Sequence, residues 1–439
     1  MAEASSSTDP ATVMRSRQFL GLLALAAVVG VVASFAAWCF LELVHEVQDG
    51  VYQDFPEALG YETTPLWWPL PVLALTGVVV AFAIFRLPGQ GGHIPAQGLN
   101  PAPTKPVELP GVMLAAVEAI GLGTVLGPEA PLIALGGGLG YFAIGRLRAD
   151  APPELAALVA ACGTFAALSF LFGSPVIAAV ILIEATGLGG KRLSLVLIPG
   201  LLAAGIGTLV SIGLGAWSGV DSSDISLSLL PVAEFARPDA IDFLWTVPLA
   251  AAIAIGTVAI FRLGRTTYRV VGSRPLVIPL VGLMVAGLAI AFSETTDKGM
   301  NQVLFSGQDA LGPLVANADA WSLTALALLI GFKGLAYALS LGSFRGGPVF
   351  PAMFLGAAAG LMAAQLPGFD LTPAVAVGLG AAVVAVLRLP LSAVVLATLL
   401  TSQAGLGAGP LVIVGVVVAY LVANVIDPPP EELQPAAAD

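Results

Sequence analysis

The sequence predicts an all-α polytopic membrane protein built from two inverted-topology repeats with broken, re-entrant helices. Three observations predict this fold class: an extreme apolar composition, long uncharged runs along the chain, and a Gly/Pro pattern that occurs twice. The chain has 439 residues, of which 57% are hydrophobic and only 10% charged, whereas a soluble globular chain carries about 25% charged residues. This composition excludes a cytosolic enzyme.

The uncharged apolar runs are each long enough for a transmembrane helix, which needs about 20 residues. The expected spans are residues 19–40, 65–85, 196–220, 243–261, 275–292, 352–369 and 389–426, the last long enough for two elements. Because the first run is too long for a signal-peptide core, we expect a retained first helix. The expected division is a tail (1–18), a first repeat (19–216), a connecting loop (217–239), a second repeat (240–426) and an acidic, Pro-rich tail (427–439).

Basic residues gather in alternate connections between these spans, as the positive-inside rule requires. The bases expected on one side are Arg15, Arg17, Arg86, Lys105, Arg146, Arg148, Lys191, Arg192, Arg262, Arg265, Arg269 and Arg274. Acidic segments at residues 46–62, 221–242 and 294–298 fall on the other side. We therefore expect a multi-pass protein of the cell membrane with a cytoplasmic N-terminus. The net charge of −11 offers no cationic stripe for nucleic acid.

A duplicated motif marks helix starts inside the membrane. Residues 127–140 (GPEAPLIALGGGLG) and 347–360 (GPVFPAMFLGAAAG) align without a gap, and a second Pro-led apolar segment follows each, opened by Pro175 and Pro390. Proline is tolerated in the first turn of a helix. Half-helices in inverted-repeat transporters aim their N-termini at a midplane site, and free N–H groups with the helix dipole favour an anion there. The alternative interpretation is that Gly and Pro merely kink bundle helices.

These motifs resemble those of the CLC family of chloride channels and chloride–proton antiporters. That family carries GSGIP, G(R/K)EGP and GxFxP signatures, each at a helix N-terminus facing the central anion. The matching residues are Gly91, Gly92, His93, Ile94 and Pro95; Gly127, Pro128, Glu129, Ala130 and Pro131; and Gly347, Pro348, Val349, Phe350 and Pro351. The resemblance covers residues 19–426. It implies helix starts after Gly91, Gly127 and Gly347 that hold a small inorganic anion, above all chloride, and a homodimer with one pore per subunit.

Glu129 is the gate in this resemblance: it occupies an anion site when ionised and leaves it when protonated. The alternative is a structural cap, since a carboxylate at a helix N-terminus is favourable by itself. Arg345 is a candidate pore charge, against a snorkelling arginine in a vestibule, because intramembrane cations are functional candidates. His93 is a candidate anion donor or proton relay, against a loop histidine bonded to backbone. Glu184 is a candidate for the proton path, against a plain carboxylate at a helix end.

The sequence also departs from the family pattern. Gly92 replaces the anion-binding serine, Pro128 replaces the base before the gating glutamate, and Ala185 stands where proton-coupled members carry an inner glutamate. The family's pore tyrosine and cytoplasmic nucleotide-binding pair have no counterpart in the sequence. A channel, a chloride–proton antiporter with another proton path, and a transporter of another solute on an unrelated inverted-repeat fold therefore remain as alternatives.

Enzymatic chemistry finds no support in the sequence. His45-Glu46 lacks the second histidine of a zinc motif, and Cys39 and Cys162 lie in apolar stretches that suggest neither a disulfide framework nor a thiolate metal site. We expect no enzymatic activity, no cofactor and no metal site.

Overall fold

Helix follows helix in this computed structural model, which describes residues 14–99, 103–187, 193–218, 227, 229–272 and 274–428. Nine helices of these residues are long and apolar enough to cross a membrane. The bases expected at Lys191 and Arg192, and residues 221–226 and 228 of the acidic segment 221–242, lie outside the described residues.

The elements of the first half run from α2 to α9. They are α2 (Arg17–Asp49), the π-helical turn η1 (Gly50–Asp54), α3 (Phe55–Ala58), α4 (Pro69–Arg86), the 3₁₀ turns η2 (Pro88–Gly91) and η3 (Pro95–Gln97), α5 (Leu109–Gly121), α6 (Glu129–Leu147), α7 (Pro153–Leu171), α8 (Pro175–Thr186) and α9 (Leu193–Ser218).

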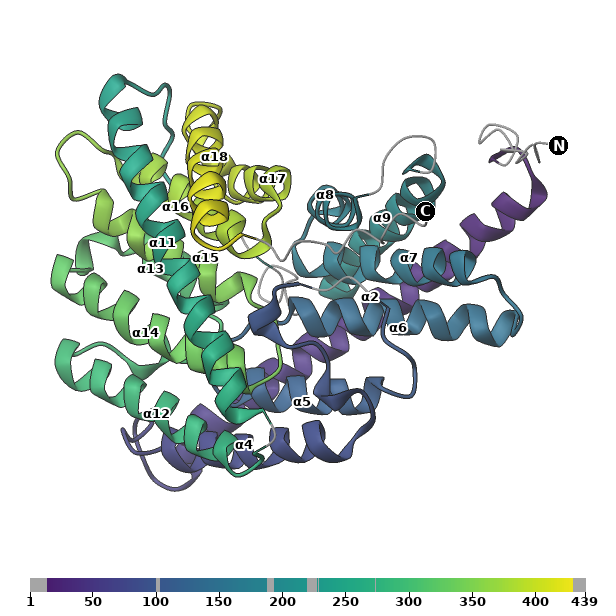
Figure 1. Cartoon of the computed structure of the whole chain (residues 1–439), viewed down its shortest axis with the longest axis horizontal. Coiled ribbons are helices and arrows are strands. Elements are labelled where there is room, and N and C mark those ends of the chain that lie inside the picture. Colours follow the sequence, from purple (N-terminus) through teal and green to yellow (C-terminus); the bar gives the residue numbers. More distant parts are fainter. Residues whose placement is uncertain are drawn as a thin grey trace, which may run out of the picture.

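The elements of the second half run from α11 to α18. They are α11 (Ala240–Val271), α12 (Val277–Thr296), η5 (Met300–Gln302), α13 (Gln308–Ala316), η6 (Ala318–Ala320), α14 (Leu323–Ser343), α15 (Val349–Ala363), α16 (Leu371–Leu387), α17 (Pro390–Leu400), η7 (Ser402–Ala404) and α18 (Gly409–Ile426). In Figure 1 most first-half helices lie to the right and the second-half helices to the left, while α4 crosses over to pack beside α12.

Helices occupy all seven predicted runs, and four further long helices, α6, α7, α14 and α16, were not predicted as spans. Lys333 interrupts α14, and charged residues lie at both ends of α6. α16 has only 17 residues between Asp370 and Arg388. α7 carries an acid only in its first turn, and Gly173 and Pro175 break the uncharged stretch that follows it. Charges and Gly/Pro breaks therefore hid these helices from a search for long uncharged runs.

Short helices begin where the prolines predicted. Pro175 opens α8 and Pro390 opens α17, while Pro128 and Pro348 are the N-cap residues of α6 and α15. α8 and α17 have 12 and 11 residues. At 1.5 Å per residue they are too short for a hydrocarbon core of about 30 Å. These are half-helices, as the motif spacing predicted.

The helix expected to start after Gly91 is absent, and that prediction was wrong. Between Arg86 and Leu109 the described residues form only the 3₁₀ turns η2 and η3. Gln90, Gly91 and Gly92 have φ angles of 50°, 72° and 100°, in the left-handed region that an α-helix of L-residues cannot use. The first signature is therefore a loop.

The same glycine crossing occurs in both halves. A Cβ at Gly136 of α6 would collide with the carbonyl of Gly163 on α7, and a Cβ at Gly356 of α15 would collide with the carbonyl of Gly378 on α16. Small residues let membrane helices approach closely. The two helices that open at the duplicated motif are thus packed against the helix that follows each by equivalent contacts.

Candidate functional site

The two duplicated helix starts meet backbone to backbone. The N–H of Gly127 donates to the carbonyl of Gly347 at 2.7 Å, and the N–H of Gly347 donates to the carbonyl of Gly127 at 2.5 Å. These residues form an isolated antiparallel bridge. Because α6 begins two residues after Gly127 and α15 two residues after Gly347, the positive ends of both helix dipoles lie beside one point.

Glu129 places its carboxylate at that point. The side chain comes from the first residue of α6 and is 1% exposed. Its Oε1 accepts a hydrogen bond from the N–H of Val349, the first residue of α15, while Oε2 has no hydrogen-bond partner among the described residues. A Cβ at Gly347 would overlap this carboxyl group. Glycine at both bridge positions therefore leaves the space that the carboxylate occupies.

A cavity of about 250 Å³ lies next to this carboxylate, and we name it the Arg345 cavity. Its lining includes residues of the first two predicted signatures and the two residues that precede the third: Gly91, Gly92, His93, Ala130, Pro131, Arg345 and Gly346. The side chain of Arg345 is 5% exposed. Its Nε donates to the carbonyl of Gln90 at 3.2 Å and its Nη1 to the carbonyl of Phe344 at 3.1 Å. No carboxylate forms an ion pair with it among the described residues, although Glu108 also lines the cavity.

The loop of the first signature explains why Gly92 stands in place of serine. At its φ of 100° a side chain is strained, and a Cβ would meet Cγ1 of Val112 at 3.1 Å. His93 follows with its imidazole half-buried. One ring nitrogen interacts with the backbone of Gly98, and Nε2 is buried without a partner among the described residues. His93 therefore matches the backbone-bonded alternative at one nitrogen and keeps a free nitrogen at the other.

A second cavity, of about 650 Å³, lies at the opposite end of α4, and we name it the Asp309 cavity. Its lining residues include His45, Asp49, Tyr52, Phe305 and Asp309. The hydroxyl of Tyr52 donates to the carbonyl of Leu122 at 3.0 Å, and the N–H of Phe305 donates to the carbonyl of Gly123 at 3.3 Å. The loop that leads from α5 to Gly127 thus starts beside the Asp309 cavity.

The other predicted site residues surround this centre without lining either cavity. Ile94 and Pro95 belong to the η3 turn, which packs against α11 and α14. The ring of Phe350 stacks on that of Phe172 with centroids 5.9 Å apart. Pro128, Pro348 and Pro351 are buried at the two helix starts. These residues shape the backbone of the helix starts, whereas Glu129 and Arg345 supply the charges.

Two polar residues of α14 are functional candidates that the sequence motifs missed. Tyr337 is fully buried and its hydroxyl donates to the carbonyl of Pro348 at 2.5 Å. Lys333, also fully buried, donates to the carbonyls of Gln302, Val303, Leu304 and Phe305 at 3.0–3.2 Å and lies 4.6 Å from the ring centroid of Phe354. Their i, i+4 spacing, which puts both on one helix face, is the signal that could have found them.

Glu184 lies away from both cavities and binds the start of α17. Its Oε1 accepts from the N–H of Leu391 at 2.9 Å, and its Oε2 accepts from the N–H and the hydroxyl of Ser392 at 2.7 and 2.6 Å. These are the contacts of a helix cap supplied by another helix. They correspond to the structural alternative for this residue.

The arrangement of paired helix starts, a competing carboxylate and an unpaired buried cation is one that can hold a small anion. The chain matches the family described as voltage gated chloride channel over residues 93–424. It belongs to that family. The match contains the last three residues of the first signature, the whole of the other two, and the α8 and α17 half-helices. It makes the chain a multi-pass membrane protein of an anion-transporting family.

Relatives and solved structures agree with the family assignment. The "Putative ion-transport protein YfeO" of Escherichia coli O1:K1 is 31% identical over 353 residues, which cover 79% of this chain and 80% of the relative, and the protein of the same name from Escherichia fergusonii matches to the same extent. A slow cyanobacterial Cl⁻/H⁺ antiporter has the same fold with a TM-score of 0.73 at 19% identity, covering 92% of this chain and 95% of that one. A CLC-type fluoride/proton antiporter gives a TM-score of 0.69 at 18% identity over 92% and 96%.

Proposed function

We propose that this protein transports chloride across the cell membrane through the gap between α6 and α15, with Glu129 as a protonatable gate. The observation that carries the proposal is the position of the Glu129 carboxylate on the N–H of Val349, where an incoming anion would be held by the same donor. Ionised, the carboxylate competes with the anion; protonated, it loses the charge that the two helix dipoles stabilise.

The two cavities supply the approaches to this gate. The Arg345 cavity is lined by Ala130 and Gly346, which flank the bridge, and the Asp309 cavity ends at the loop before Gly127. A dehydrated anion needs favourable charge along its path, and Arg345 provides it in place of the base that Pro128 replaces. We assign anion binding to the backbone of the two helix starts. Nε2 of His93 becomes a further donor when the imidazole is protonated, because the other ring nitrogen donates to the backbone of Gly98.

The orientation follows from charge. We propose that the N-terminus lies in the cytoplasm, because Arg86, Arg146 and the four arginines of residues 262–274 would then lie on the cytoplasmic side. The Arg345 cavity would open to the cytoplasm, since it lies beyond the end of α4 at Arg86.

We propose a homodimer that buries the exposed apolar face of α18. Ile413, Val417, Leu421 and Val425 recur every fourth residue on this helix and are 49–82% exposed, and Val176 and Leu391 lie at the exposed starts of α8 and α17. A stripe of this kind suits helix packing in a bilayer. Cross-linking of single-cysteine variants at Val417 in membranes tests it; cysteines at Ile255 of α11 serve as the control.

The test of the proposed function is anion efflux from liposomes that contain the purified protein, measured with chloride, nitrate and fluoride in parallel. Chloride efflux that rises as the pH falls supports the proposal, and the Glu129→Gln variant should show the high efflux of low pH at neutral pH as well. No flux of any of the three anions would contradict it and favour a carrier of another solute.

Chloride–proton exchange is the second candidate, and the observation that favours it is the gate itself, because a carboxylate that must take up a proton to leave its site can carry that proton. A pH electrode in the same liposome experiment distinguishes the two: proton uptake driven by a chloride gradient indicates exchange. The sequence made Glu184 the candidate for the proton path. Its carboxylate accepts hydrogen bonds from the N–H groups of Leu391 and Ser392, which favours a proton route that does not use it.

A further inference from the structure

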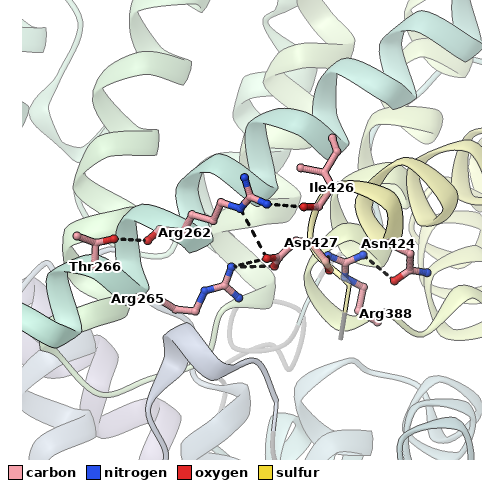
Figure 2. Close-up of polar contacts among 7 residues, drawn as sticks. All are labelled: Arg262, Arg265, Thr266, Arg388, Asn424, Ile426 and Asp427. Atoms are coloured by element: carbon pink, nitrogen blue, oxygen red, sulfur yellow. Dashed lines mark hydrogen bonds and ion pairs between the residues drawn. The ribbon is translucent and has the colours of Figure 1, made fainter. Parts of the chain in front are cut away.

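Three arginines surround Asp427 at the end of α18, away from the gate (Figure 2): two contact its carboxylate and the third its backbone carbonyl. Arg265 of α11 donates through Nη2 to both oxygens of Asp427, at 2.9 and 2.8 Å. Arg262, one turn earlier, lies with Nε 3.6 Å from Oδ1 of Asp427 and donates through Nη2 to the carbonyl of Ile426. The α11 arginines thus hold the last residues of α18.

Arg388 completes the cluster from the opposite side. It follows α16 with a left-handed φ of 59°, donates through Nη1 to Oδ1 of Asn424 at 2.9 Å, and approaches the carbonyl of Asp427 through Nη2 at 3.4 Å. Three guanidinium groups and one carboxylate leave an excess of two positive charges. Since each guanidinium has five N–H donors, most donors of the cluster are not used by these contacts.

The cluster is accessible from the side where α11 faces lipid. The side chains of Arg262 and Arg265 are 54% and 37% exposed. Ile255, which is 53% exposed, precedes Arg262 by seven residues, so two helical turns place both on one face. Leu263, beside Arg262, is 40% exposed. The apolar lipid-facing surface of α11 therefore ends in a group of arginines, which is where a phospholipid headgroup lies.

We propose that Arg262, Arg265 and Arg388 bind the phosphate of an anionic phospholipid. Guanidinium groups form bidentate, charge-assisted hydrogen bonds with phosphate, and basic pockets between transmembrane helices at a membrane face bind anionic headgroups. Asp427 occupies part of the site and competes with the phosphate for Arg265. The proposal depends on the helices lying in a bilayer and not on the anion gate.

The experiment measures lipid binding to the purified full chain in neutral detergent, by native mass spectrometry and by the shift in unfolding temperature. Phosphatidylglycerol is compared with phosphatidylcholine of the same chains and with inorganic phosphate. Arg262→Gln should weaken phosphatidylglycerol binding about fivefold, the size expected for one basic side chain at an anionic lipid surface, while the pair of Arg265 with Asp427 stays in place.

Asp427→Asn is the decisive variant, because the direction of its change in phosphatidylglycerol binding tests the proposal. It removes the competing carboxylate, so phosphatidylglycerol should bind more tightly, whereas Arg265→Gln breaks the same ion pair and should weaken binding. Arg148→Gln is the matched control, because it breaks the ion pair with Asp150 at 3.7 Å outside the cluster and should leave binding unchanged.

Three results would overturn the proposal: equal binding of phosphatidylglycerol and phosphatidylcholine, weaker binding in both Asp427→Asn and Arg265→Gln, or an equal loss in Arg148→Gln. Inorganic phosphate that protects the protein as well as the lipid does would assign the cluster to free phosphate instead. A failure of chloride flux leaves these outcomes unaffected, so the two proposals fail separately.

Discussion

The N–H of Val349 donates a hydrogen bond to the carboxylate of Glu129, 220 positions earlier in the chain. The contact joins the first residue of α15 to the first residue of α6, and the bridge between Gly127 and Gly347 holds the two helix starts at that spacing.

The first prediction follows directly from this contact. Glu129→Gln removes the charge that competes for the Val349 donor, so chloride efflux at neutral pH should rise about tenfold or more, since a hydrogen bond to a charged group contributes about 1.5–3 kcal/mol. Efflux from liposomes between pH 4.5 and 7.5 measures it, and Glu154→Gln, on the exposed start of α7, should behave as the unmodified protein.

Gly347→Ala tests the space beside the gate. A Cβ there would overlap the Glu129 carboxyl, so the side chain should be displaced and efflux at neutral pH should rise towards the level of Glu129→Gln. In the Glu129→Ala background the space is free, and Gly347→Ala should then change efflux less than twofold, because residues that share one contact are not additive. Equal effects of Gly347→Ala in both backgrounds would show that it acts elsewhere.

Arg345 supplies the buried positive charge of its cavity. Arg345→Gln should raise the chloride concentration for half-maximal flux about tenfold, the scale of one lost charged interaction, with a smaller effect on the maximal rate. Arg345→Lys keeps the charge and loses the planar donor that reaches Gln90. Its chloride concentration for half-maximal flux should therefore lie between those of the unmodified protein and Arg345→Gln. A concentration series of chloride in planar bilayers or liposomes measures both parameters. Unchanged half-saturation in Arg345→Gln would remove this residue from the pathway.

Lys333 is predicted to matter for stability more than for transport. Lys333→Met keeps the apolar stem and leaves four carbonyl oxygens without their donor; at about 1–3 kcal/mol for a buried unsatisfied group, the unfolding temperature should fall clearly. Lys298→Met is the matched control. Its ammonium contacts one carbonyl, that of Ala320 at 3.0 Å, and the ring of Trp321 at 4.9 Å, so a smaller change is expected. Thermal unfolding of the purified protein compares them.

Glu184 separates a structural carboxylate from a proton carrier. Glu184→Ala removes the acceptor of the first N–H groups of α17 and should reduce stability by about 1–2 kcal/mol, as for a lost N-cap, while any proton uptake driven by chloride stays the same. Unfolding temperature and pH-electrode recordings on one preparation measure both. Loss of proton uptake with unchanged chloride flux would place Glu184 on a proton path.

Local chemistry explains what the sequence predicted well. Pro128, Pro175, Pro348 and Pro390 mark helix starts because a proline lacks the N–H that the first turn leaves unpaired anyway. The apolar runs marked most of the spans because a bilayer admits few charges. Both signals are contained in a few neighbouring residues, so no knowledge of the fold was needed.

The tertiary structure alone decided which of these pieces meet. Gly127 and Gly347 pair across 220 residues, Glu184 of one half caps a helix of the other, and Lys333 is tolerated in the core because carbonyls from a distant segment surround it. The loop at Gly91, expected as a helix, takes positive φ angles where it packs against α5 and Arg345. The physical reason is common to all four: hydrogen bonds and steric contacts between segments far apart in the chain have no local sequence pattern, whereas helix starts and apolar spans do.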